Sequence, residues 1–143
     1  MTQIKDVMTK DVITVSPDAS LKEVGTILKE KRISGVPVVD GDKNIVGIIT
    51  VNDILKILEE IYQWQEVERS ATGINLSELV GKERLNSKVR TIMSKNVYTL
   101  EESKTMSDVM RLMFSKKIHT IPIIRDNKLV GVIGKRDLVY ACF

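Results

Sequence analysis

Apolar and polar residues follow the same order twice along this chain. Short apolar runs at 12–15 and 97–100 predict strands, and after each run apolar residues recur every three or four positions, as on one face of a helix. Two more apolar runs then flank a turn of Asp, Gly and Asn residues, which predicts a hairpin. A second helix closes each copy, so the predicted order of elements in both copies is β-α-β-β-α.

Polar residues mark where the first helix of each copy begins. Ser20 is followed three positions later by Glu23, and Thr105 is followed by Asp108. This is the spacing of a capping box, which supplies hydrogen-bond partners to the free N–H groups of a first helical turn. The closing helices are expected to begin at positions 52 and 136.

The two copies also match position by position, residues 4–43 with 89–128 and residues 45–55 with 129–139. Identical pairs include Met8/Met93, Pro37/Pro122, Gly47/Gly131 and Asp53/Asp137. Because proline cannot donate a hydrogen bond to a neighbouring strand, each first hairpin strand is predicted to lie at a sheet edge or to begin near its proline. Two copies, rather than a long array, predict a pseudo-two-fold pair.

A long connection joins the copies. The chain is expected to divide into three segments, namely 1–55, 56–88 and 89–143. Within the connection, Leu76–Val80 predicts a further short helix. The helix before it carries the apolar residues Ile57, Ile61, Tyr62 and Trp64. These side chains either meet a partner subunit or cap the core, and the sequence leaves both interpretations open.

The composition is that of a folded domain. Of 143 residues, 43% are hydrophobic and 29% are charged, which suits a protein with a core of its own. No apolar run approaches the roughly 20 residues of a membrane helix, and Lys5 and Asp6 stand where a signal peptide would be apolar. The single cysteine, Cys142, excludes an intrachain disulfide. These features predict a cytoplasmic protein that does not enter a membrane.

The charge is mildly basic, with a net charge of +3 and an isoelectric point near 9.0. Lysines and arginines are interleaved with acidic residues, and aromatic residues make up only 4% of the chain. A nucleic-acid interface would instead need a basic stripe or aromatic stacking platforms. The pattern therefore argues against nucleic acid as a partner.

No arrangement of residues predicts catalysis. With one histidine and one cysteine, the usual ligands of a transition-metal site are missing. The paired carboxylates Glu59-Glu60 and Glu101-Glu102 are neighbours in sequence, and neighbours on a helix do not face each other. We therefore expect neither an enzyme nor a metal site.

The end of each hairpin carries the most informative motif. In 47–55 and 131–139 an apolar strand runs straight into a helix, and such a junction gathers free N–H groups that can receive an anion. Thr50 and Asp53 form either a helix cap or part of a ligand site, and both interpretations stay open. In the second copy Gly134 replaces the hydroxyl while Asp137 remains, which is what a ligand-binding role for the carboxylate would need.

This order of elements, with Val36-Pro37-Val38-Val39-Asp40 in the hairpin and Gly47-Ile48-Ile49-Thr50-Val51-Asn52-Asp53-Ile54 at its end, resembles the CBS domain, named after cystathionine β-synthase. Two copies resemble a CBS pair, or Bateman module. The resemblance implies an α+β fold in which two β-α-β-β-α repeats pack about a pseudo-two-fold axis and leave two equivalent clefts. It also implies that the clefts bind AMP, ADP, ATP or S-adenosylmethionine, with the Asp on the ribose and the preceding hydroxyl near phosphate.

The resemblance, carried over by position, implies which residues line each cleft. The first cleft would contain Ile48, Thr50, Asp53, Val97, Tyr98, Ile118 and His119. The second cleft would contain Val12, Ile13, Ile33, Ser34, Val132, Gly134 and Asp137. His119 and Arg136 would reach phosphate, although from the residues alone each is equally a surface group. The first cleft is favoured, because the second has Gly134 and Ser34 where the first has Thr50 and His119.

The resemblance implies a stand-alone regulatory module that binds an adenosine-containing ligand, AMP, ADP or ATP above all, and requires no cofactor. Binding would change the arrangement of the repeats, and an unidentified protein partner or a second copy in a homodimer would respond. The alternative is a structural dimerisation module whose clefts no longer bind a ligand. Its dimer face would be Ile57, Ile61 and Trp64.

Overall fold

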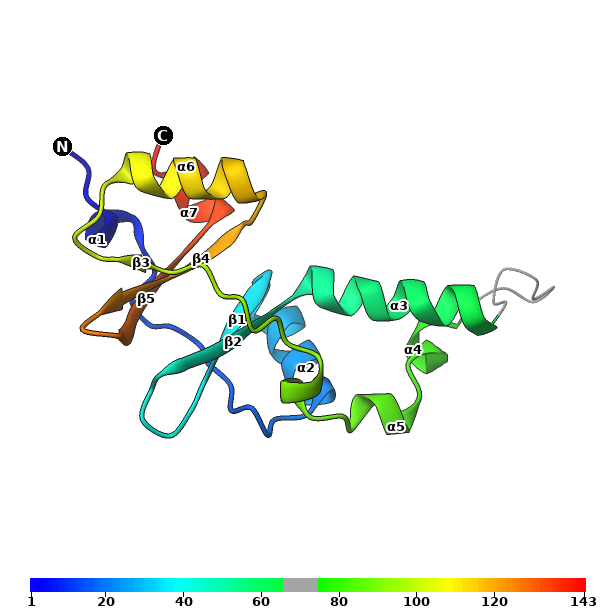
Figure 1. Cartoon of the computed structure of the whole chain (residues 1–143). Coiled ribbons are helices and arrows are strands. Elements are labelled where there is room, and N and C mark those ends of the chain that lie inside the picture. The colour runs from blue at the N-terminus through cyan, green and yellow to red at the C-terminus, as the bar shows by residue number, and fades with distance from the viewer. Residues whose placement is uncertain (66–74) are drawn as a thin grey trace.

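The computed structural model describes residues 1–65 and 75–143, apart from the side chains of residues 64 and 65 (Figure 1). Its helices are α1 (Ile4–Val7), α2 (Leu21–Lys31), α3 (Val51–Gln65), α4 (Leu76–Leu79), α5 (Lys82–Leu85), the 3-10 helix η2 (Val89–Thr91), α6 (Met106–Lys116) and α7 (Lys135–Tyr140). Its strands are β1 (Gly35–Val39), β2 (Ile45–Thr50), β3 (Leu100–Glu101), β4 (Thr120–Arg125) and β5 (Lys128–Gly134). The predicted mixture of helices and strands in two repeats is confirmed.

An antiparallel hairpin forms the centre of each repeat, β1 with β2 and β4 with β5. The register of the first hairpin shifts between Val38 and Val39, and that of the second shifts between Ile123 and Ile124. These are equivalent positions of the two repeats, so the repetition extends to the irregularities of the sheet. Figure 1 shows the two hairpins lying side by side at the centre of the molecule.

The first strand of each repeat is shorter than predicted. Of the run 12–15, only Val15 pairs with β1. Its N–H donates to Pro37 O at 3.2 Å, and its carbonyl oxygen accepts from Val39 N–H at 3.0 Å. In the second repeat only β3 pairs, in parallel with β4. The preceding residues form irregular chain, which leaves them free to line a cavity.

The prolines do not both mark an edge strand. Pro37 lies in a two-stranded sheet whose other side meets Val15 through an isolated bridge, but β4, which contains Pro122, lies between β3 and β5. The edge position is therefore wrong for β4, whereas the alternative applies, because β4 begins at Thr120, two residues before Pro122. Pro122 is tolerated there because the pairing with β3 begins only at Ile123, so no partner requires the missing N–H.

The predicted helix starts are confirmed to within one residue. Ser20 Oγ accepts from Glu23 N at 3.1 Å, and Thr105 and Asp108 form a reciprocal capping box. Both helices end at a residue in the left-handed conformation, Arg32 with φ 53° and Lys117 with φ 54°. The closing helices begin at positions 51 and 135, one residue before the expected positions.

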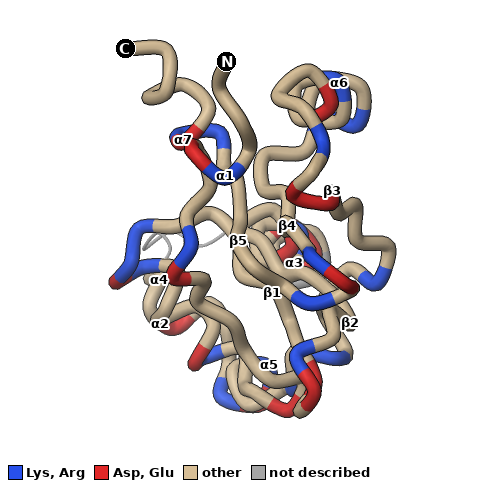
Figure 2. Tube along the Cα trace, turned by 90° about the vertical axis from the view of Figure 1, so that its left-hand side faces the viewer, with Lys and Arg blue, Asp and Glu red and all other residues tan. Residues whose placement is uncertain are grey.

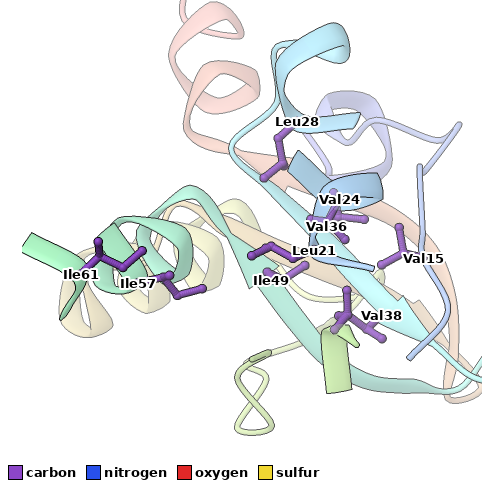
Figure 3. Packing of buried hydrophobic residues seen from close by; sticks show 10 residues of the cluster. Val15, Leu21, Val24, Leu28, Val36, Val38, Ile49, Ile57 and Ile61 are labelled. Carbon is purple, nitrogen blue, oxygen red and sulfur yellow. The ribbon is translucent and has the colours of Figure 1, made fainter. Parts of the chain in front are cut away.

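The first repeat packs around a continuous apolar cluster, shown in Figure 3. Ile57 and Ile61 belong to it and are only 4% and 7% exposed, so of the two open interpretations the core one is confirmed for them and the partner face is wrong. Leu79 and Val80 pack against the same cluster, and the chain around α4 therefore covers this side of α3. Tyr62 is exposed, whereas the side chain of Trp64 lies outside the described residues.

The first residues of each repeat pack on the other repeat. Ile4 is buried in the core of the second repeat, and Val89 is buried in the core of the first. Thr9 exchanges backbone hydrogen bonds with Val132, and Ser94 does the same with Ile48, at 2.8 to 3.0 Å. The segments expected from the sequence, 1–55 and 89–143, are each continuous in the chain. In space, however, the first residues of each segment pack into the core of the other.

Charged residues are spread over the whole molecule. Figure 2 shows Lys and Arg interleaved with Asp and Glu along helices and turns, without a single basic stripe. Among the described residues, none of the helices combines the length and the apolar content that crossing a membrane requires.

Candidate functional site

Two cavities lie where the repeats meet. The first cleft has a volume of about 350 Å³ and the second has a volume of about 650 Å³. Both fall in the range of known small-molecule sites. Each is lined by the end of one hairpin and the start of its closing helix, facing the irregular segment and the hairpin start of the other repeat.

The first cleft brings together all the residues that the resemblance implied for it. They are Ile48, Thr50, Asp53, Val97, Tyr98, Ile118 and His119. The structure adds residues that the sequence reasoning missed, among them Ser94, Lys56, Lys117 and Lys135. The sequence offered little indication of these residues, because polar and charged residues of this kind are common on protein surfaces. Only the folded structure shows that they lie at a cavity.

Thr50 and Asp53 form a helix cap at the wall of the first cleft. Asp53 Oδ2 accepts from Thr50 N at 2.8 Å and from Thr50 Oγ1 at 3.2 Å, and Asp53 N donates to Thr50 Oγ1 at 3.4 Å. Ser94 Oγ donates to Asp53 Oδ1 at 3.4 Å. The capping interpretation is thus confirmed, and it leaves the ligand interpretation open because a carboxylate accepts several hydrogen bonds.

The aromatic and imidazole side chains of the first cleft are accessible. Tyr98 is 43% exposed, and Lys116 Nζ lies 5.5 Å from the centroid of its ring. His119 is exposed, and its carbonyl oxygen accepts from Lys135 N at 3.0 Å. Both side chains can therefore contact a ligand without first leaving a packed core.

The second cleft likewise brings together its implied residues. They are Val12, Ile13, Ile33, Ser34, Val132, Gly134 and Asp137, with Arg136 beside them. Asp137 Oδ2 accepts from Gly134 N at 2.8 Å, and Thr9 Oγ1 donates to Asp137 Oδ1 at 3.2 Å. Asp137 therefore still caps its helix, so its presence without a preceding hydroxyl does not by itself indicate a ligand.

Arg136 belongs to the second cleft. Its Nη1 donates to the carbonyl oxygen of Arg32 at 2.8 Å, which ties the closing helix of one repeat to the end of α2 in the other. A guanidinium has five N–H groups, so this contact leaves donors for an anion. The equivalent position in the first cleft is Asn52, which is uncharged.

Cations outnumber carboxylates in both clefts. The lining of the first has Lys56, Lys117 and Lys135 against Asp53. The lining of the second has Lys31, Arg32, Lys135 and Arg136 against Asp11 and Asp137. Such a cluster of one sign of charge at a concave surface attracts an anionic ligand.

The preference for the first cleft stays a prediction. It depends on Thr50 and His119, which the second cleft lacks, whereas the second cleft is larger and carries more cations. Within the described part of the chain, no group of His, Cys, Asp or Glu side chains is placed to hold a metal ion.

Comparison with known proteins identifies the family. The model of the CBS domain matches residues 4–60 and 89–143. This chain belongs to the CBS domain family. Two matched segments in one chain make it a CBS pair, as the sequence predicted.

The relatives of this CBS pair differ in length. The chain is 32% identical, over 94% of its length, to inosine-5'-monophosphate dehydrogenase of Methanocaldococcus jannaschii, of which it spans 22%. It is 30% identical to the protein MJ1426 of the same organism, covering 96% of this chain and 89% of that protein. Because the match to the dehydrogenase covers only 22% of that enzyme, it indicates a regulatory CBS module rather than a catalytic domain.

A solved CBS pair has the same fold. The structure of the CBS domain pair of protein MJ0100, in complex with 5'-methylthioadenosine and S-adenosyl-L-methionine, has a TM-score of 0.77 and 26% identity to this chain. The match covers 99% of this chain and 96% of that one.

Proposed function

We propose that this CBS pair is a regulatory module whose clefts bind a phosphorylated adenosine, namely AMP, ADP or ATP. The observation that carries the proposal is the lining of each cleft, in which a helix-capping Asp from one repeat faces apolar residues of the other among an excess of cations. The apolar residues suit a base, the carboxylate suits ribose hydroxyls, and the cations suit phosphate.

The charge of the lining favours phosphate over sulfonium. The related MJ0100 pair is in complex with 5'-methylthioadenosine and S-adenosyl-L-methionine, which supports the adenosine part of the proposal. S-adenosylmethionine carries a positive sulfonium, and three lysines line the first cleft. A nucleotide with one or more phosphates would be attracted by the same lysines.

The regulatory step would be a change in the arrangement of the repeats. A ligand in the first cleft would contact Asp53 of one repeat and Tyr98 and His119 of the other. It would bind best to the arrangement in which both walls are at contact distance, and it would thereby raise the population of that arrangement. A protein partner, not yet identified, would respond to this population.

Thermal unfolding with a panel of ligands tests the proposal. At 100 times its dissociation constant, a ligand should add about 2.7 kcal/mol to the apparent free energy of unfolding. We expect AMP, ADP or ATP to raise the melting temperature, and S-adenosylmethionine, adenosine and NAD to raise it less. No shift with any of these ligands at millimolar concentration would exclude this function.

A matched pair of variants tests which cleft binds more tightly. Asp53→Ala and Asp137→Ala each remove one helix cap, so both should lower the ligand-free melting temperature to a similar degree. We expect Asp53→Ala to reduce the ligand-induced shift more than Asp137→Ala does. A larger loss with Asp137→Ala would assign the tighter site to the second cleft.

A structural dimerisation module is the second candidate, supported by exposed apolar side chains on α6 and on the closing helix α7 of the second repeat. Phe114 is 66% exposed and Tyr140 is 70% exposed, whereas the equivalent residues of the first repeat are Lys29 and Lys56. These side chains would replace the buried Ile57 and Ile61 as the face of a homodimer. Light scattering that shows a dimer, together with no response to any adenosine ligand, would favour this function.

A further inference from the structure

The two clefts share a wall. Ser34, Val51, Thr120 and Lys135 line both cavities. Ser34 Oγ and Thr120 Oγ1 are 3.5 Å apart and join the hairpin starts of the two repeats. A ligand in one cleft would therefore be separated from a ligand in the other by this shared wall.

The wall is built from equivalent positions. Val51 N donates to Ser34 O at 2.9 Å, and Lys135 N donates to His119 O at 3.0 Å. Val51 and Lys135 are the first residues of α3 and α7, so the backbone of the wall obeys the pseudo-two-fold symmetry. The side chains do not, because one position is apolar and the other is a cation.

Lys135 is the cation that the two linings have in common. Lys56 and Lys117 line the first cleft only, and Arg32 and Arg136 line the second only. Lys135 is exposed, and within the described part of the chain no carboxylate forms an ion pair with it. Its flexible stem and single ammonium allow it to approach an anion on either side.

We infer that Lys135 is a phosphate-binding residue shared by both clefts and that it couples their occupancy. The inference rests on the proposed function, since it requires a phosphorylated ligand in each cleft. One ammonium lies against one phosphate at a time, and the two phosphates repel each other. A ligand in one cleft therefore weakens the binding of a second ligand in the other.

Calorimetric titration with AMP of variants that retain one working cleft tests the sharing. Asp137→Ala leaves the first cleft and Asp53→Ala leaves the second. Adding Lys135→Met should weaken AMP binding about threefold or more in both backgrounds, because it removes the charge and keeps the apolar stem. Lys135→Arg should retain the affinity, and Lys29→Met, which lies on α2 and lines neither cleft, should have no effect.

The coupling between the clefts is tested by adding a second cation at position 51, which is equivalent to position 135. In the wild type, the second AMP should bind about fivefold or more weakly than the isolated clefts predict. Val51→Lys places an ammonium at the equivalent position, so each phosphate has its own partner and the difference should shrink. Adenosine, which has no phosphate, should show no such difference.

The outcomes separate the two proposals. If the wild type binds neither AMP nor ATP, the proposed function fails. If the wild type binds AMP but Lys135→Met weakens only one cleft, or if Val51→Lys leaves the coupling unchanged, the function stands and the shared role of Lys135 is overturned.

Discussion

One carboxylate organises the turn of the first hairpin. Asp40 Oδ1 accepts from the N–H groups of Asp42 and Asn44, each at 2.9 Å. Lys128 of the other hairpin donates to Asp42 O at 2.7 Å and to Asn44 Oδ1 at 3.0 Å. The hydrogen bond from Asn44 N–H, with smaller contributions from Asp42 and Lys128, holds the pKa of Asp40 below its ordinary range.

The lowered pKa of Asp40 predicts a pH dependence of stability. A carboxyl whose pKa is lower in the folded state stabilises the fold fully above its unfolded pKa, near 4, and loses that contribution as the pH falls through the folded pKa. Asp40→Asn should therefore be less stable than the wild type at pH 7, and this difference should shrink as the pH falls below the unfolded pKa and through the folded pKa. Urea unfolding at pH 7 and at a series of acidic pH values measures this. Asp42→Asn is the control, and an equal pH dependence in all three proteins would contradict the prediction.

At the scale of elements, the sequence predicted the helices better than the first strands. Helix starts are local, because a cap is made by residues three positions apart, as in Thr105 and Asp108. The strand at 97–100 depends on a partner far along the chain, and the pairing with β4 begins only at Leu100. Apolar content alone could not show where that pairing begins.

Two equivalent glycines allow the first segment of each repeat to pack closely against a hairpin strand of the other repeat. A Cβ at Gly47 would overlap the sulfur of Met93 and would lie 3.0 Å from Ser94 O. A Cβ at Gly131 would overlap the sulfur of Met8 in the same way. The identical Met and Gly positions of the repeats are thus explained by close packing between a methionine of one repeat and a hairpin strand of the other.

Gly47→Ala should destabilise the protein by about 1–3 kcal/mol, because the added methyl group must displace Met93 or the backbone beside it. Met93→Ala removes the larger obstacle, so the double variant should lose less than the sum of the single variants. Denaturant unfolding of the four proteins measures the coupling. Gly25→Ala, in α2 with nothing within 4 Å of the new Cβ, should be neutral or stabilising. If the losses of unfolding free energy in the two single variants simply add in the double variant, contact with Met93 is not the reason that position 47 requires glycine.

At the scale of the whole molecule, the two repeats cannot be separated at a single point of the chain. Ile4 is fully buried in the core of the second repeat, although it begins the first. Val89 is fully buried in the core of the first repeat, although it begins the second. A ligand that contacts both repeats therefore acts on two interlocked cores.

Truncating these two residues should have crossed effects. Ile4→Ala and Val89→Ala should each cost about 2–4 kcal/mol, the usual range for a large-to-small change in a core. Hydrogen exchange should show that Ile4→Ala lowers protection mainly in residues 106–134 and that Val89→Ala lowers it mainly in residues 21–61. Loss of protection confined to the repeat that carries the substitution would contradict the interlocked arrangement.

The sequence by itself determined the repeat, the order of elements and the helix caps, because these depend on spacing along the chain and both repeats carry the same pattern, down to Asp53 and Asp137. Residues that line each cleft were implied by the resemblance to the CBS domain, and the structure added others such as Lys56 and Lys117. The tertiary structure alone decided that Ile57 and Ile61 are core and that one lysine, Lys135, lies in a wall common to both clefts. Burial and shared walls depend on which distant segments cover a residue, and local spacing carries no information about that.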